Sequence, residues 1–118
     1  MKLIHSCCYA IAGIKYCFKS ELNFRVHLFA TVLVSVVGFI CNISAAEWIA
    51  VGFCIVLVLA MEMINTAIEK LCDVVHKERH PEIKIVKDIS AGAVLLAASF
   101  SLITATIIFL PKIIMYFK

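Results

Sequence analysis

The fold is decided by a run of 22 residues without a charged side chain, ISAGAVLLAASFSLITATIIFL at positions 89–110. About 20 apolar residues suffice for a helix to cross a bilayer, so this run predicts a membrane span. A second charge-free run, LFATVLVSVVGFICNISAA at positions 28–46, predicts another. Between them, the apolar residues 48–61 continue through a glutamate and an asparagine to position 68, which predicts a middle span that carries polar side chains.

The composition of the chain agrees with a membrane protein. Of 118 residues, 64% are hydrophobic and 16% are charged, whereas soluble domains average roughly 45–50% apolar and 25% charged residues. The length allows three spans and one further segment but no separate soluble domain. The net charge of +3, without a block of basic residues, gives no reason to expect a nucleic-acid partner. The six cysteines show no C-x-x-C pair, and we interpret them as packing residues.

An amphipathic surface helix is predicted ahead of the first span, because apolar side chains recur at spacings of three and four from Leu3 to Leu22. Nine of the eleven basic residues lie before the first span or between the second and third. The positive-inside rule therefore places the N-terminus and residues 70–87 in the cytoplasm and the C-terminus outside. We expect an all-α membrane protein with a surface helix at 1–24 and transmembrane helices at 26–46, 47–73 and 82–110.

Short motifs mark the helix boundaries. Ser44 and Glu47 have the spacing of a capping box at a helix start, and Trp48 beside them suits an aromatic anchor at the membrane interface. Pro81 fits the first turn of the last helix. Small residues between 91 and 101 form a surface that favours tight packing or oligomerisation of membrane helices.

A polar stripe is predicted on the middle helix. If that helix continues to about residue 76, then Glu62, Asn65, Glu69, Asp73 and His76 fall on one face. One interpretation is a buried polar seam in which Asn65 and Glu69 form hydrogen bonds with neighbouring helices. We favour a functional role for Glu62, because intramembrane carboxylates are rare and usually functional, and a buried carboxylate suits a general base.

Charged residues near the predicted cytoplasmic side suit a phosphate substrate. Glu69 and Glu21 could share a Mg²⁺ ion with it, although Glu21 could equally be a solvated turn residue. Lys87 could bind phosphate with Asp88 orienting it, and the alternative is a snorkelling lysine beside a carboxylate. The four glycines lie too far apart for a phosphate-binding loop, so a nucleotide would be held by charged side chains and a metal.

These residues resemble a known family. The run 62–69 with Asp73, followed by 78–81 and the Lys87-Asp88 pair, resembles the signature of the prokaryotic integral-membrane diacylglycerol kinase and undecaprenol kinase family. The resemblance covers nearly the whole chain. It implies a surface helix and three membrane helices in the bacterial cytoplasmic membrane, assembled as a homotrimer whose active sites are shared between protomers and face the cytoplasm. It also implies ATP as co-substrate and Mg²⁺ as cofactor.

The resemblance implies roles for individual residues as well. Glu62 corresponds to the catalytic base, Asn65 to a polar active-site residue, and Glu21 and Glu69 to the metal and ATP site. The other expected ATP contacts are Lys2, Tyr9, Glu78, Arg79, His80, Lys87 and Asp88, with Lys2 at a position where relatives have arginine. We expect substrate contacts from Glu62, Arg25, His27 and Trp48.

The position of His27 bears on the lipid substrate. By resemblance, diacylglycerol-specific enzymes carry an acidic residue there, whereas undecaprenol-specific relatives read N-F-R-x-H, as residues 23–27 do here. The Ala91-Gly92 pair also resembles the undecaprenol branch. We therefore expect an ATP-dependent kinase that phosphorylates the hydroxyl of undecaprenol, with diacylglycerol as the alternative substrate.

Two other classes of protein were open on the residues alone. A small proton-coupled transporter would use Glu62 in a midplane cavity, but the position of Glu62 near one end of its span, beside a basic loop, favours headgroup chemistry. A purely structural membrane oligomer would explain the small residues of the last span. It would leave the polar stripe unexplained.

Overall fold

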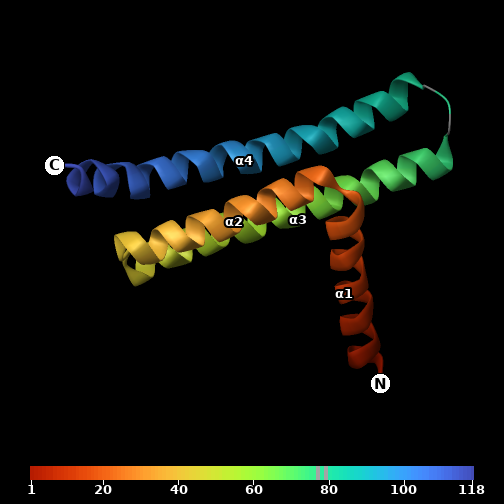
Figure 1. Cartoon of the computed structure of the whole chain (residues 1–118). Helices are drawn as coiled ribbons and strands as arrows, with labels where there is room; N and C mark the ends of the chain where they lie inside the picture. The colour runs from red at the N-terminus through yellow and green to blue at the C-terminus, as the bar shows by residue number, and fades with distance from the viewer. Residues whose placement is uncertain (77, 79) are drawn as a thin grey trace.

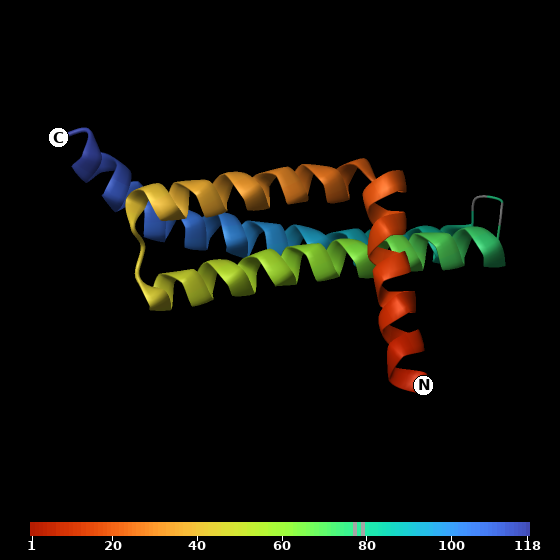
Figure 2. The same cartoon turned by 60° about the horizontal axis from the view of Figure 1, so that its bottom comes forward.

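The computed structural model describes residues 1–76, 78 and 80–118, which form four helices (Figure 1). In chain order they are α1 (Lys2–Ser20), α2 (Leu22–Cys41), α3 (Ala45–Val75) and α4 (Pro81–Tyr116). Helices α2, α3 and α4 lie side by side, whereas α1 turns sharply away from them and projects to one side (Figures 1 and 2). This confirms the predicted all-α fold, and α2, α3 and α4 are each long and apolar enough to cross a membrane.

Local hydrogen bonds set the boundaries of α3 and α4. The predicted capping box is present: Ser44 Oγ accepts a bond from the Glu47 N–H at 3.2 Å, and Glu47 Oε1 accepts one from the Ser44 N–H at 2.9 Å. At the start of α4, His80 Nδ1 accepts a bond from the backbone N–H of Glu82 at 3.2 Å. Pro81 occupies the first turn, where its missing N–H costs no intrahelical bond.

A tight elbow joins α1 to α2. Only Glu21 lies between the two helices, in an extended backbone conformation. The Arg25 guanidinium donates hydrogen bonds to the carbonyls of Phe18 and Lys19, both at 2.9 Å. These carbonyls belong to the last turn of α1, where the backbone C=O groups have no N–H partner within the helix. Arg25 therefore fixes the direction in which α1 leaves the bundle.

The apolar core lies at the end of the bundle near the turn between α2 and α3, which we call the 42–44 end. It is formed by Ile43, Val51, Ile108 and Phe109. At the same end Lys112 Nζ lies 3.3 Å from Glu47 Oε1, which connects α4 to α3. Most large apolar side chains elsewhere are exposed, as expected for helices whose outer faces contact lipid or another chain.

Helix α4 extends beyond the charge-free run that predicted it. It continues through Pro111 to Tyr116 and has 36 residues. Proline inside a helix removes one backbone hydrogen bond and favours a kink, and the C-terminal part of α4 is deflected from the rest of the helix in Figure 2.

Candidate active site

The polar stripe of α3 runs from the interior of the bundle to its surface. Glu62 and Thr66 are buried, Asn65 and Glu69 are half-buried, and Asp73 is exposed. All five lie on one helix, because α3 continues without interruption to Val75. The stripe therefore leads from a buried carboxylate toward the end of the bundle near residues 76–80, which we call the 76–80 end.

Glu62 is the most buried of the candidate catalytic residues. It exposes 4% of its surface, and its Oε1 lies 3.2 Å from Nε2 of His27 on α2. The Thr66 hydroxyl donates to the backbone carbonyl of Glu62 at 3.0 Å and so does not contact its carboxylate. A buried carboxylate needs a hydrogen-bonding partner, and His27 supplies one from a different helix. No local pattern in the sequence indicated this contact.

Asn65 and Glu69 form a second polar pair one turn further along α3. Asn65 Nδ2 donates a hydrogen bond to Glu69 Oε1 at 3.0 Å. The other side-chain atom of the amide, Asn65 Oδ1, is buried and has no hydrogen-bond partner among the described residues. A buried acceptor without a partner is costly, so this oxygen is available to a cation or to a donor on a ligand.

The residues around Glu69 fit a Mg²⁺ ion. Carboxylate and amide oxygens are hard ligands, and Mg²⁺ is usually held by one or two carboxylates together with substrate phosphates and water. Among the described residues, no group of three or more His, Cys, Asp or Glu side chains is arranged to hold a metal. Glu69 and Asn65 nevertheless provide two oxygen atoms of the kind that Mg²⁺ prefers.

Glu21 lies level with Glu69 along the bundle. Helices α2 and α3 run antiparallel with a rise of about 1.5 Å per residue, so the contact of His27 with Glu62 places residue 21 beside residue 68. Glu21 belongs to the elbow that Arg25 holds. The fold thus brings the two predicted metal ligands to the same level from different elements.

Cys17 is the buried residue of the surface helix. Burial raises the pKa of its thiol, and the negative charges of Glu21 and, more weakly, Glu62 raise it further, while the Thr66 side chain lowers it. Neither Cys17 nor Thr66 was a predicted site residue. The position of Thr66 four residues after Glu62, on the polar face, was the one signal that could have indicated it.

Lysines of α4 pair with acidic residues near the 76–80 end. Lys87 Nζ lies 2.8 Å from Asp73 Oδ1 on α3, and Lys84 Nζ lies 2.6 Å from Asp88 Oδ2. The acidic partner of Lys87 is therefore Asp73, whereas Asp88, one of the two alternatives that the sequence left open for this pair, contacts Lys84. Asp73, which was not among the predicted site residues, holds Lys87 across the interface between α3 and α4.

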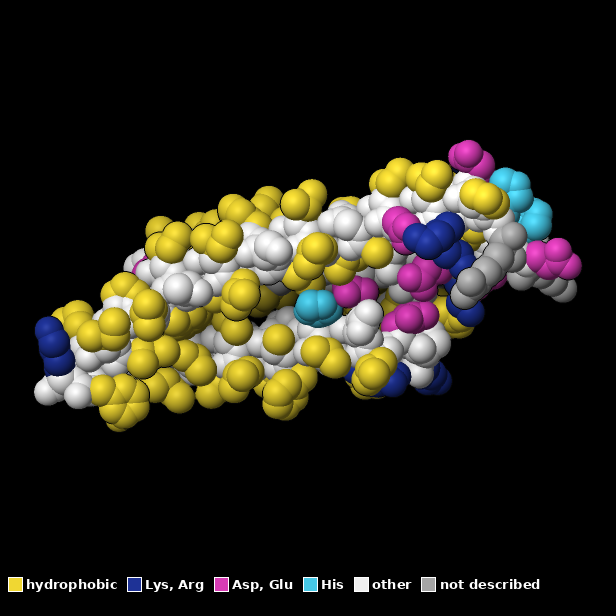
Figure 3. Space-filling view, turned by 90° about the horizontal axis from the view of Figure 1, so that it is seen from above, with side chains coloured by type: hydrophobic (Ala, Val, Ile, Leu, Met, Phe, Trp, Pro, Cys, Tyr) yellow, Lys and Arg dark blue, Asp and Glu magenta, His cyan; other side chains and the backbone are white. Residues whose placement is uncertain are grey.

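A pocket of about 620 Å³ lies at the 76–80 end. Its size is within the range of small-molecule sites. Three predicted ATP contacts, Glu78, His80 and Lys87, line it together with Asp73 and His76. Arg79, another predicted ATP contact, lies outside the described residues. Figure 3 shows charged side chains and histidines gathered over this part of the molecule, while apolar side chains dominate the remainder of the visible face.

The structure does not bring every predicted residue to Glu62. Lys2 and Tyr9 are exposed on the part of α1 that projects away from the other helices (Figure 2). Trp48 lies at the 42–44 end, fourteen positions or about 21 Å along α3 from Glu62, where its ring packs on Gly38. Arg25 donates its hydrogen bonds to the elbow.

The fold and this site define a class: a multi-pass, all-α membrane protein with a buried carboxylate at one end of a polar stripe. Residues 8–109 match the family described as "Prokaryotic diacylglycerol kinase", and the chain belongs to that family. It is a membrane lipid kinase with ATP and a lipid as its substrates. Family membership thus decides against a transporter or a purely structural oligomer.

Individual relatives carry two different names. The chain is 38% identical over 101 residues to an undecaprenol kinase of Bacillus subtilis (strain 168), covering 86% of this chain and 82% of that protein. It is 36% identical over 107 residues to a diacylglycerol kinase of Synechocystis, covering 90% of this chain and 61% of that longer protein. It is 32% identical over 108 residues to a diacylglycerol kinase of Pseudomonas aeruginosa, covering 91% and 88%.

Proposed function

We propose that this lipid kinase transfers the γ-phosphate of ATP to the hydroxyl of undecaprenol. The observation that carries the proposal is the histidine at position 27, which faces the carboxylate of Glu62 at 3.2 Å. By resemblance, diacylglycerol-specific enzymes have an acidic residue at this position. The similarity to the undecaprenol kinase of Bacillus subtilis supports the same substrate.

In the proposed reaction, Glu62 is the general base. The hydroxyl oxygen of the lipid attacks the γ-phosphorus of ATP and forms a new P–O bond, while the bond to the bridging oxygen breaks and ADP leaves with its electron pair. Glu62 accepts the hydroxyl proton. His27 holds the carboxylate in place, and Asn65 fixes Glu69 through their hydrogen bond.

ATP would lie between α3 and α4. Glu78 and His80 line the pocket at the 76–80 end, and Lys87 enters it from α4, held by Asp73. Glu21 and Glu69 would hold a Mg²⁺ ion, with the free Asn65 Oδ1 nearby. When bound, Mg²⁺ neutralises negative charge on the transferred phosphoryl group.

The active sites would be shared between copies of a homotrimer. Lys2 and Tyr9, two expected ATP contacts, lie on the projecting part of α1, whereas Glu78, His80 and Lys87 lie at the 76–80 end. A neighbouring copy could bring the two sets together, and the number three rests on the resemblance alone. The basic residues favour a cytoplasmic location for α1 and the 76–80 end, with the 42–44 end outside.

A lipid panel tests the proposal. Purified protein with Mg²⁺ and ATP is offered undecaprenol, diacylglycerol or ceramide in mixed micelles, and phosphorylated lipid is quantified. We expect undecaprenyl phosphate as the main product, and its loss when EDTA removes Mg²⁺. Because two of the relatives above are diacylglycerol kinases, phosphatidic acid is the main product expected if the substrate proposal is wrong.

A further inference from the structure

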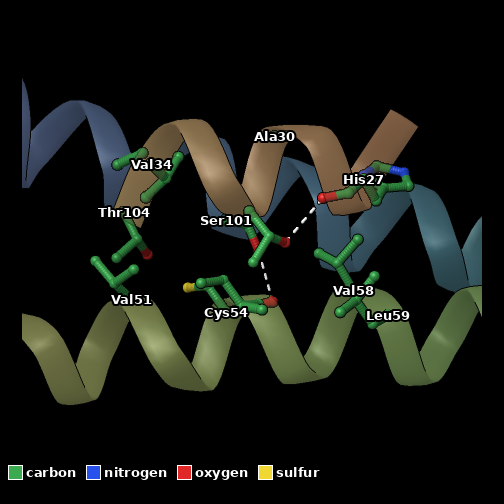
Figure 4. A pocket seen from close by; sticks show the side chains of 12 residues that line it. His27, Ala30, Val34, Val51, Cys54, Val58, Leu59, Ser101 and Thr104 are labelled. Carbon is green, nitrogen blue, oxygen red and sulfur yellow. Dashed lines mark hydrogen bonds between the residues drawn. The ribbon is translucent and has the colours of Figure 1, made fainter. Parts of the chain in front are cut away.

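An apolar pocket of about 110 Å³ opens between α2, α3 and α4 (Figure 4). It lies near the proposed catalytic carboxylate, because His27 both lines the pocket and contacts Glu62. One face of each helix lines it. His27, Thr31 and Val34 follow at helical spacing on α2, opposite Cys54 and Val58 of α3, and α4 closes it with Thr104. From residue 27 to residue 34 the pocket extends about 10 Å along α2, within the candidate spans.

His27 connects this pocket to the reaction. The same side chain that lies 3.2 Å from Glu62 Oε1 forms one end of the pocket wall. Leu59, another lining residue, stands one turn before Glu62 on α3. A lipid whose hydroxyl reaches Glu62 therefore has the mouth of the pocket directly beside its first carbon atoms.

The lining is chemically suited to hydrocarbon. The Thr31 hydroxyl donates to the His27 carbonyl at 2.8 Å, and the Ser101 hydroxyl donates to the Ala97 carbonyl at 2.9 Å. Both donors are thus occupied by the backbone, so neither is free for an ester carbonyl. An ester carbonyl placed against either of them would be left unpaired, at a cost in affinity, and the third lining hydroxyl, that of Thr104, lies on the α4 side of the pocket.

The size of the pocket matches a short branched segment. An apolar cavity of about 150 Å³ stays dry and accommodates benzene. A pocket of about 110 Å³ therefore has room for four or five carbon atoms, roughly one isoprene unit.

We infer that this pocket binds the hydrocarbon chain of the lipid alcohol immediately behind its hydroxyl, and that its small, mostly apolar lining favours a prenyl chain over an ester-linked one. The inference rests on the proposed function for the identity of the lipid. It assigns the pocket to substrate and not to a neighbouring copy of the chain, because the pocket is continuous with the partner of the catalytic base.

Two threonines of α4 provide a matched test by kinetics. Thr104 lines the pocket, whereas Thr106 is exposed two residues away, on another face of the helix. Thr104→Leu should fill the pocket and lower kcat/KM for the lipid about tenfold or more while leaving KM for ATP unchanged. Thr106→Leu should stay within about twofold of the unmodified enzyme, because the added carbon atoms project away from the pocket. Equal effects of the two changes, or a Thr104→Leu defect seen in KM for ATP, would overturn the inference.

A photolabelling experiment on the unmodified protein does not depend on the variants folding. A farnesol analogue with a diazirine in the isoprene unit next to the hydroxyl should label peptides containing residues 27–34 or 51–59, and undecaprenol should compete. Labelling confined to other peptides would overturn the pocket assignment. Because the kinetic test uses whichever lipid alcohol the unmodified enzyme phosphorylates best, a preference for diacylglycerol would refute both the proposed substrate and the selectivity of the pocket. The comparison of Thr104→Leu with Thr106→Leu would still decide whether the pocket holds the lipid chain.

Discussion

At the scale of single residues, the proposed chemistry depends on the contact between His27 and Glu62. Carboxylates are expensive within a membrane and are kept there by partners. Here the imidazole approaches from α2, so the hydroxyl of a lipid that enters between the helices meets a carboxylate already held in place. Asn65 holds the carboxylate of Glu69 in place in a similar way, through a hydrogen bond within α3. The base and the proposed metal ligand are thus positioned independently.

Replacing the base should stop the reaction without unfolding the protein. Glu62→Gln keeps the size and the hydrogen-bonding capacity of the side chain but removes the proton acceptor. We expect turnover to fall by about 10² or more, with helical content unchanged by circular dichroism. Near-normal turnover in the folded variant would exclude Glu62 as the base.

The two proposed metal ligands should act as one unit. Glu21→Gln and Glu69→Gln should each raise the Mg²⁺ concentration required for half-maximal activity, because each removes a ligand of the same ion. The double variant should lose little more activity than the less active of the two single variants, since the effects of replacing groups that act together are not additive. Steady-state rates over a Mg²⁺ titration measure this, and additive losses would mean that the residues act separately.

Local spacing explains which parts of the site could be predicted from the sequence. Glu62, Asn65 and Glu69 were found because residues three and four apart share a helix face. The His27–Glu62 contact joins residues 35 positions apart and depends on the register between α2 and α3. No local pattern encodes that register. The same holds for the contact of Lys87 with Asp73.

At the scale of helices, the hairpin of α2 and α3 sets this register. Asn42 ends α2 in the left-handed conformation with φ of 53°, and the Ser44 capping box begins α3 two residues later. The Trp48 ring packs so closely on Gly38 that a Cβ there would lie 2.7 Å from it. The capping box could be predicted because its pattern spans four residues. The contact between Trp48 and Gly38 could not, because it depends on how closely two helices approach.

Substitutions at two glycines test how closely α2 and α3 pack in the hairpin. Gly38→Ala should destabilise the protein by about 1–3 kcal/mol, because the Trp48 ring must move and overpacking is costly. Gly52→Ala is the matched control: an added Cβ meets nothing within 4 Å, and alanine favours the helix by about 0.5–1 kcal/mol. Thermal unfolding in detergent would compare them. Equal stability of the two variants would contradict a tight contact at Gly38.

At the scale of the whole molecule, the apolar core, the proposed lipid pocket and the charged residues occupy different positions along the bundle. The apolar core and the Glu47–Lys112 ion pair hold the 42–44 end together. The lipid pocket lies in the middle, and charged residues gather toward the 76–80 end (Figure 3). The surface helix projects sideways from the bundle, so its N-terminal half could contact another copy of the chain. Periodicity predicted that helix, but the direction in which it projects depends on the elbow at Arg25.

Mixing two inactive variants tests whether sites are shared between copies. Tyr9→Ala alters α1 and Glu62→Gln alters α3, so each variant alone should lose activity. If α1 of one copy completes the site on α3 of its neighbour, assemblies reconstituted from both variants contain some intact sites and should regain kinase activity. Subunits mixed after assembly, without exchange, are the control and should stay inactive. Failure to recover activity in exchanged assemblies would indicate a site within one copy.

The measurement that tests the account most directly is the ratio of kcat/KM for undecaprenol to that for diacylglycerol, in the unmodified enzyme and in His27→Glu. We predict a ratio above about ten in the unmodified enzyme, because each unpaired ester carbonyl costs about 1–3 kcal/mol. The ratio should fall in His27→Glu, which introduces the acidic side chain that, by resemblance, diacylglycerol-specific enzymes have at this position, and should stay high in the control His27→Gln. A preference of the unmodified enzyme for diacylglycerol would contradict the proposed substrate.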